Sequence, residues 1–78
     1  MELTQKQLEQ VRKQYRLSPR ETQIVDLILR GCDSNAEIAL VLDITEGTAK
    51  QYVHVLYAKT QTNSKLRLAL KIINSIHE

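Results

Sequence analysis

The 78-residue chain has few of the residues that specialised architectures require. Its single cysteine, Cys32, cannot form an internal disulfide, and no second thiol is present to build a thiolate metal site. The chain has no Trp or Phe, only three Tyr, two Gly and one Pro, and no apolar run approaches the roughly 18 residues of a membrane span. The polar start does not fit a signal peptide. We therefore expect a cytoplasmic, all-α domain with an aliphatic core.

Charge is distributed unevenly along the chain, although the formal net charge is only +2. Residues 1–20 hold five cationic and two anionic side chains, a net charge of +3. Residues 21–46 hold one cationic and six anionic side chains (−5), and residues 47–78 hold five cationic and one anionic (+4). This segregation would give a basic face if like charges gather on folding. Charges scattered over the whole surface fit the same blocks, so the distribution permits a nucleic-acid partner without requiring one.

Apolar residues recur at spacings of three and four, the period of an amphipathic helix. A first helix over residues 3–16 carries one narrow apolar stripe. A second begins at the capping box Ser18-Pro19-Arg20-Glu21 and ends before Gly31. A third, short helix begins at a second capping box, Ser34-Asn35-Ala36-Glu37, and ends near Asp43. A last helix is expected to begin at Ser64-Lys65, with Ser64 or Asn63 as its cap.

Residues 45–60 are predicted to form the helix around which the chain is organised. Thr45 can cap its start, because a Thr oxygen accepts a hydrogen bond from a first-turn amide. Its inward stripe is predicted to be Ala49, Val53, Leu56 and Thr60. The remaining surface carries groups suited to phosphates and base edges: Thr48, Lys50, Gln51, His54 and Lys59. An ordinary solvated surface helix would have the same pattern.

The short third helix and the longer helix after it are separated by only a few residues, as in a helix-turn-helix. In such a unit the first helix braces against the phosphate backbone and the second enters the major groove. This arrangement favours nucleic-acid contact by residues 45–60.

Several motifs follow one another in an order that resembles the LuxR/GerE-type (NarL-like) DNA-binding domain of bacterial regulators. They are Leu17-Ser18-Pro19-Arg20-Glu21, Gly31, Ala36-Glu37-Ile38-Ala39 and Ile44-Thr45-Glu46-Gly47-Thr48-Ala49-Lys50. The resemblance runs from about Leu17 to about Ile73. It implies a four-helix helix-turn-helix domain over residues 17–78 with a C-terminal dimerisation helix, to which residues 1–16 add an extra helix. The chain is also similar to the smallest, stand-alone family members, and Met1 with the added helix favours an intact small protein.

The resemblance implies a role for individual residues. The base-facing positions would be Lys50, Gln51 and His54. The phosphate contacts would be Asn35, Thr45, Thr48 and Lys59. These side chains have fitting chemistry, because amides, hydroxyls and ammonium groups donate to phosphate oxygens and base edges. Glu21 is expected to cap its own helix, and the resemblance adds an ion pair with a basic residue such as Lys65.

The chain differs from the family pattern at several positions. Ala49 stands where Val is usual, Tyr52 where His is common, and His54 where a basic residue is frequent. Thr60-Gln61-Thr62 replaces the usual Leu-Gly-Val that closes the recognition helix. Without that Gly, the helix is expected to run on to Gln61 or to end through Asn63, which tolerates the left-handed conformation.

The last helix carries more apolar surface than a terminal helix needs to cover its own core. Leu66, Ala69, Leu70 and Ile73 form one stripe, which we expect to pack inward. Leu68, Ile72 and Ile76 form an adjacent stripe, which we expect to form the interface of a symmetric dimer. The alternative is that the extra N-terminal helix covers this second stripe within the chain.

No catalytic or metal-binding constellation is visible. His54 and His77 are 23 positions apart without further ligands at suitable spacing, so no metal site and no cofactor is predicted. Ser18, Ser34 and Ser64 each have a capping role. Cys32 has an acidic neighbour, which does not favour a reactive thiolate. We therefore expect no enzyme.

Two functions remain open. The first is a transcriptional regulator that binds duplex DNA as a homodimer. The second is a protein-interaction module or anti-activator that heterodimerises with a larger regulator. Lys50, Thr48 and Asn35 favour the first, whereas the low net charge, His54 and Thr60-Gln61-Thr62 favour the second.

Overall fold

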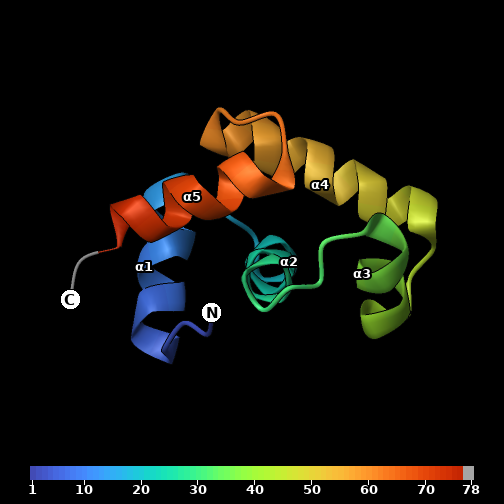
Figure 1. The fold of residues 1–78 in the computed structure, drawn as a ribbon, viewed down its shortest axis with the longest axis horizontal. Helices are drawn as coiled ribbons and strands as arrows, with labels where there is room; N and C mark the ends of the chain where they lie inside the picture. Colours follow the sequence, from blue (N-terminus) through green and yellow to red (C-terminus); the bar gives the residue numbers. More distant parts are fainter. Residues whose placement is uncertain (77–78) are drawn as a thin grey trace.

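A computed structural model describes residues 1–76 of the chain, which contain five helices and no strand (Figure 1). The helices are α1 (Gln5–Tyr15), α2 (Pro19–Leu29), α3 (Asn35–Leu42), α4 (Glu46–Thr60) and α5 (Lys65–Ser75). The all-α prediction is confirmed, and the helix ends lie within two residues of the predicted ones. His77, considered above as a metal ligand, lies outside the described residues. In the part that the structure describes, none of the helices has the length and apolar character needed to cross a bilayer.

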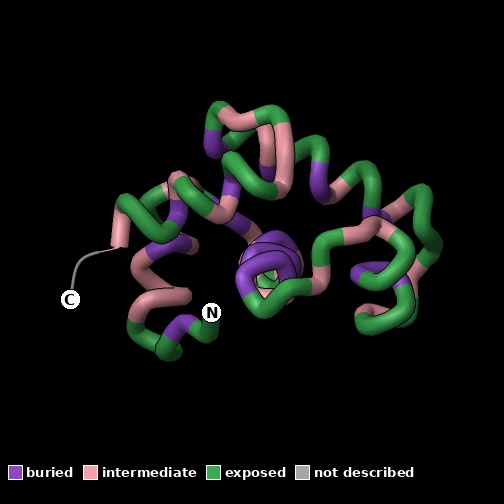
Figure 2. Tube along the Cα trace, in the orientation of Figure 1, coloured by how far each residue is buried: buried purple, intermediate pink, exposed green. Residues whose placement is uncertain are grey.

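Helix α2 lies at the centre of the molecule, with α4 and α5 above it and α1 and α3 on opposite sides in the view of Figure 1. It contacts α1, α4 and α5, whereas α3 packs mainly against α4. Four of its apolar side chains are buried: Ile24, Val25, Ile28 and Leu29. Figure 2 shows this concentration of buried residues on α2. The hydrophobic core therefore forms around α2 and joins the end of the molecule that carries α3 and α4 to the end that carries α1 and α5.

The start and end of α2 have the predicted caps. The Ser18 hydroxyl accepts a hydrogen bond from the Glu21 amide at 3.1 Å, and the Glu21 carboxylate accepts one from the Ser18 amide at 2.8 Å. Pro19 occupies the first turn, where its missing N–H costs nothing. Beyond the other end, Gly31 has φ of +104°, a conformation that favours glycine. These local signals explain why the boundaries of α2 were predictable.

The second predicted capping box forms only in part. The Ser34 hydroxyl accepts a hydrogen bond from the Glu37 amide at 3.0 Å, but α3 lacks the reciprocal bond from the Ser34 amide to the Glu37 side chain. The Glu37 carboxylate instead lies near Cys32. Burial, together with Glu37 and Asp33, raises the pKa of the Cys32 thiol, so the thiol stays protonated at neutral pH.

The two apolar stripes of α5 are oriented opposite to the prediction. Leu68 and Ile72 are buried, with 1% and 0% of their surface exposed, whereas Leu66, Leu70 and Ile73 are 70%, 51% and 40% exposed. The expectation that this stripe packs inward was therefore wrong for Leu66, Leu70 and Ile73, whereas its fourth residue, Ala69, is partly buried against the core. Leu68 and Ile72 belong to the core of the chain and Ile76 is partly buried against it, so these side chains do not form an exposed interface.

Helices α2 and α4 pack against α5, and α1 adds to this cover. Helix α1 lies beside the C-terminal half of α5 (Figure 1), and the Tyr15 hydroxyl donates to Ser75 Oγ at 3.1 Å. Val11 and Leu3 are buried in the same core as Leu68 and Ile72. The stripe assigned to a dimer is thus covered within the chain, which was the alternative left open above.

Candidate nucleic-acid interface

Helices α3 and α4 form a helix-turn-helix with a turn at residues 43–45. Asp43 ends α3 with φ of +55°, a left-handed conformation that Asp tolerates better than most residues. The Ile44 amide donates to Ala39 O at 3.0 Å, and the partly buried Ile44 packs on the core. Thr45 then caps α4 by accepting a hydrogen bond from the Thr48 amide at 3.1 Å. The turn between the two helices is therefore held by backbone and cap hydrogen bonds at Ile44 and Thr45 and by the packing of Ile44 on the core.

One side of α4 is completely buried, as predicted. Ala49, Val53, Leu56 and Thr60 are at most 1% exposed. The one polar group in this stripe is satisfied, because the Thr60 hydroxyl donates to Leu56 O at 2.7 Å. The helix is therefore held in one rotational setting about its axis.

The opposite side of α4 is exposed and contains the three positions predicted to face bases: Lys50, Gln51 and His54. His54 lies over Tyr57, with ring centroids 6.4 Å apart. Burial raises the pKa of the Tyr57 phenol, so this ring is neutral near pH 7. A shallow hollow of about 340 Å³ runs beside Thr48 and Gln51 towards Glu21 of α2. The exposed face thus presents cationic, amide and imidazole donors next to a recessed edge.

The four residues predicted to contact phosphates differ in what their side chains already bind. The Thr45 hydroxyl donates to Thr48 Oγ1 at 2.8 Å, so the hydrogen of the Thr48 hydroxyl remains available to an outside acceptor. Asn35 Oδ1 is buried and has no hydrogen-bond partner within residues 1–76. A phosphate only accepts hydrogen bonds, so only the amide hydrogens of Asn35 could contact one.

Lys59 is engaged within the chain. Its ammonium donates to Glu21 Oε1 at 2.7 Å and to Arg16 O at 3.0 Å, which joins the last turn of α4 to α2 and to the end of α1. The expected partner of Glu21 was a residue such as Lys65, and the structure corrects this to Lys59. Burial raises the pKa of the Glu21 carboxyl, but hydrogen bonds from Lys59 and the Ser18 amide outweigh this effect, so the pKa lies below its ordinary value.

Helix α4 ends at Thr60, the last residue of the predicted range 45–60, and it does not continue to either Gln61 or Asn63. Gln61 is its C-cap, with φ of +56°, and Asn63 is not the residue that ends it. The Thr62 amide donates to Tyr57 O at 2.9 Å, and the hydroxyls of Thr60 and Thr62 are 2.9 Å apart. A non-glycine residue therefore adopts the left-handed conformation that the usual family pattern gives to Gly.

Comparison with known proteins agrees with this geometry. The sequence model of the luxR family of bacterial regulatory proteins (GerE) matches residues 15–72, which include α2 to α4 and most of α5. The chain belongs to the LuxR family of bacterial regulatory proteins. Within this LuxR-family domain, α3 and α4 are the helix-turn-helix, whereas nearly all of α1 precedes the matched residues.

A relative from Aeromonas salmonicida is 38% identical over 61 residues, which cover 78% of this chain. It carries the provisional name of an HTH-type transcriptional regulator in the exeN 3′ region. The LuxR-family chain described here spans 31% of the length of that curated relative. No solved structure matches the chain significantly.

Proposed function

We propose that this LuxR-family chain is a sequence-specific regulator of transcription that binds duplex DNA as a homodimer. Helix α4 would lie in the major groove, where Lys50 pairs with guanine O6 and N7, Gln51 with adenine N6 and N7, and His54 with a neighbouring base edge. The observation that carries the proposal is the division of α4 into two sides. Its fully buried stripe leaves Lys50, Gln51 and His54 as a single outward face.

The start of α4 supports a phosphate contact beside this face. The helix has 15 residues, and its N-terminal amides and dipole favour an anion. The available hydrogen of the Thr48 hydroxyl lies in this first turn. Thr45 would help by orienting Thr48, and Asn35 would contribute its amide hydrogens from the start of α3. Lys59 would contact a phosphate with the donor that Glu21 and Arg16 leave unused.

The exposed stripe of α5 supports the homodimer. Leu66, Leu70 and Ile73 lie on successive turns of one helix face, and a contiguous apolar surface of this kind is typical of an interface. A second copy placed on the same stripe by a two-fold axis would cover both stripes at once. Two recognition helices related in this way would read half-sites about one turn of DNA apart.

The proposal is tested by fluorescence anisotropy with mixed-sequence duplex DNA over a series of salt concentrations. We expect binding that weakens steeply with salt, with a log–log slope of about −0.9 for each phosphate neutralised. Competition between duplexes then identifies the preferred site. Absence of binding at low salt, in a sample whose helices are intact by circular dichroism, would refute DNA binding.

The second candidate function is an interaction module that forms heterodimers with a larger regulator. The observation that favours it is the engagement of Lys59 by Glu21 and Arg16, which draws one cation away from the DNA-facing surface. Sedimentation of the chain mixed with a full-length LuxR-family relative separates the two. Heterodimers that form at the expense of DNA binding would favour the interaction module, whereas homodimers that persist would favour the first proposal.

A further inference from the structure

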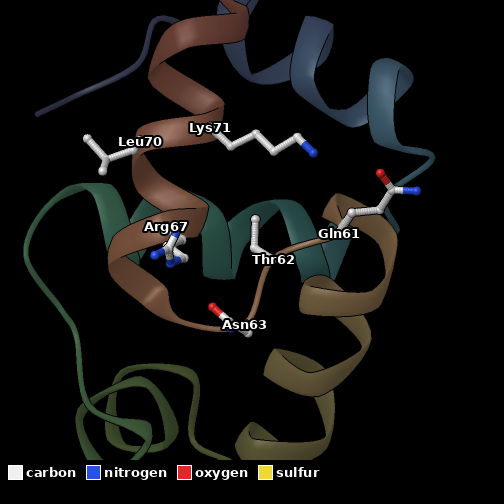
Figure 3. A pocket seen from close by; sticks show the side chains of 6 residues that line it. All are labelled: Gln61, Thr62, Asn63, Arg67, Leu70 and Lys71. Carbon is white, nitrogen blue, oxygen red and sulfur yellow. The ribbon is translucent and has the colours of Figure 1, made fainter.

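An open surface cavity of about 490 Å³ lies between the end of α4 and residues 67–71 of α5. Its lining residues come from two segments: Gln61, Thr62 and Asn63 from the loop after α4, and Arg67, Leu70 and Lys71 from α5 (Figure 3). Five of the six carry hydrogen-bond donors, and none carries a carboxylate. In Figure 3, Lys71 extends across the cavity towards the side on which Gln61 lies, whereas Leu70 points away.

The charge of this cavity is not balanced by the chain around it. Arg67 and Lys71 are one helical turn apart on α5, and neither forms an ion pair within residues 1–76. By contrast, Arg12, Arg30 and Lys59 each pair with a carboxylate. The negative end of the α4 dipole repels an anion at this place. It is equivalent to only about half an elementary charge, however, whereas Arg67 and Lys71 supply two full positive charges. The net field therefore attracts an anion.

The loop that completes the cavity is the segment in which this chain differs from the usual family pattern. Gln61 replaces a usual Gly and keeps the left-handed conformation of that position, so a primary amide stands where the pattern has no side chain. Thr62 replaces a usual Val and adds a hydroxyl, which is 2.9 Å from that of Thr60. Two polar substitutions thus lie on the same cavity as two unpaired cations.

We propose that this cavity binds a phosphate group. The planar fork of the Arg67 guanidinium matches two phosphate oxygens at once, and the Lys71 ammonium adds a compact charge. The side chains of Gln61 and Asn63 lie on the loop side of the cavity, where their amides would add further donors. A tetrahedral anion uses donors from several directions, which this arrangement supplies. The phosphate comes either from a small phosphorylated molecule or from the backbone of bound DNA.

The test is an NMR titration of the full chain with inorganic pyrophosphate at constant ionic strength, followed through the backbone amides. We expect saturable shifts confined to the loop and to the first half of α5. The double variant Arg67→Gln/Lys71→Gln, at two positions outside the core, should bind at least tenfold more weakly. Lys6→Gln/Lys13→Gln on α1 removes the same charge elsewhere and should leave the titration unchanged. Shifts that do not saturate, or that weaken equally in both double variants, would overturn the proposal.

The source of the phosphate is decided by DNA binding of the same variants. If a phosphate of the DNA backbone occupies the cavity, Arg67→Gln/Lys71→Gln reduces the log–log salt slope by about 0.9, because one phosphate is no longer neutralised. An unchanged slope together with lost pyrophosphate binding identifies a small phosphorylated molecule. The pyrophosphate titration requires no DNA, so its outcome is independent of the proposed DNA-binding function.

Discussion

The ammonium of Lys59 lies 2.7 Å from Oε1 of Glu21, across 38 positions of the sequence. The same carboxylate accepts a hydrogen bond from the Ser18 amide, and the same ammonium donates to the carbonyl oxygen of Arg16. One ion pair therefore connects the end of α4, the start of the central helix α2 and the end of α1. Glu21 is 5% exposed, so water screens its carboxylate only weakly.

Replacing Glu21 with Gln should lower the free energy of unfolding at pH 7 by about 2 kcal/mol, because a charge-assisted hydrogen bond is lost and Lys59 keeps no counter-ion. The effect should depend on pH. The carboxyl has a pKa below its ordinary value of 4.5 when folded, so its stabilisation is complete above that value and is lost as the pH falls further. Denaturant unfolding of both proteins at several pH values measures the difference.

Glu9→Gln is the matched control for this experiment, because it removes a carboxylate that pairs with Arg12 at an exposed position of α1. It should change stability far less than Glu21→Gln. A Glu21→Gln effect that persists undiminished well below pH 4 would contradict the assigned role of the carboxylate.

Replacing Lys59 with Ala should destabilise the domain and also weaken binding to every duplex alike. If its remaining donor contacts a phosphate, the log–log salt slope falls by about 0.9. Glu21→Gln provides the comparison, since it breaks the same ion pair but keeps the ammonium. Equal slopes for Lys59→Ala and the wild-type protein would leave Lys59 with a structural role alone.

Replacing Lys50 with Ala should relax sequence preference. Loss of a contact to a guanine edge costs about 1–3 kcal/mol at the preferred site and little at other sites, whereas Lys13→Ala on α1 removes one exposed charge without touching a base. Competition anisotropy with single-base variants of the preferred duplex measures both proteins. Unchanged discrimination at every base position would show that Lys50 does not read sequence.

Two substitutions in α5 should affect different quantities, one the strength of dimerisation and the other the stability of the fold. Leu66→Gln changes an exposed side chain, so it should weaken dimerisation and leave the stability of the monomer nearly unchanged. Ile72→Ala changes a buried one and should cost about 2–5 kcal/mol of stability. Sedimentation equilibrium and thermal unfolding report the two quantities. A Leu66→Gln protein with wild-type self-association would remove this stripe from the dimer interface.

Replacing Gln61 with Gly should stabilise the fold by roughly 0.5–1 kcal/mol. Relief of the left-handed strain is worth about 1–2 kcal/mol for a residue with a Cβ, and the added flexibility of glycine in the unfolded chain takes back about 0.4–1 kcal/mol. Thermal unfolding checks the sign. A lower melting temperature would mean that contacts of the Gln61 side chain outweigh the backbone strain.

Local features of the fold were predictable because their energetics are local. A cap hydroxyl is separated by only three positions from the amide that it binds, as at Ser18 and Thr45, and a helical stripe such as Ala49-Val53-Leu56-Thr60 is defined by spacing along one helix. The helix-turn-helix and its outward residues therefore followed from the sequence, and so did their resemblance to the LuxR family.

Only the tertiary structure decided which apolar stripe of α5 is buried, which cation binds Glu21, and which side chains gather around the cavity beside Arg67. The two stripes of α5 have similar hydrophobicity, so their periodicity predicts that one is buried without predicting which. The choice is made by the packing of α5 against α2 and α4, together with α1, which buries the Leu68 and Ile72 side. Contacts between distant segments, such as Lys59 with Glu21, arise when helix packing brings those segments together, and the residue sequence of either helix alone does not contain that information.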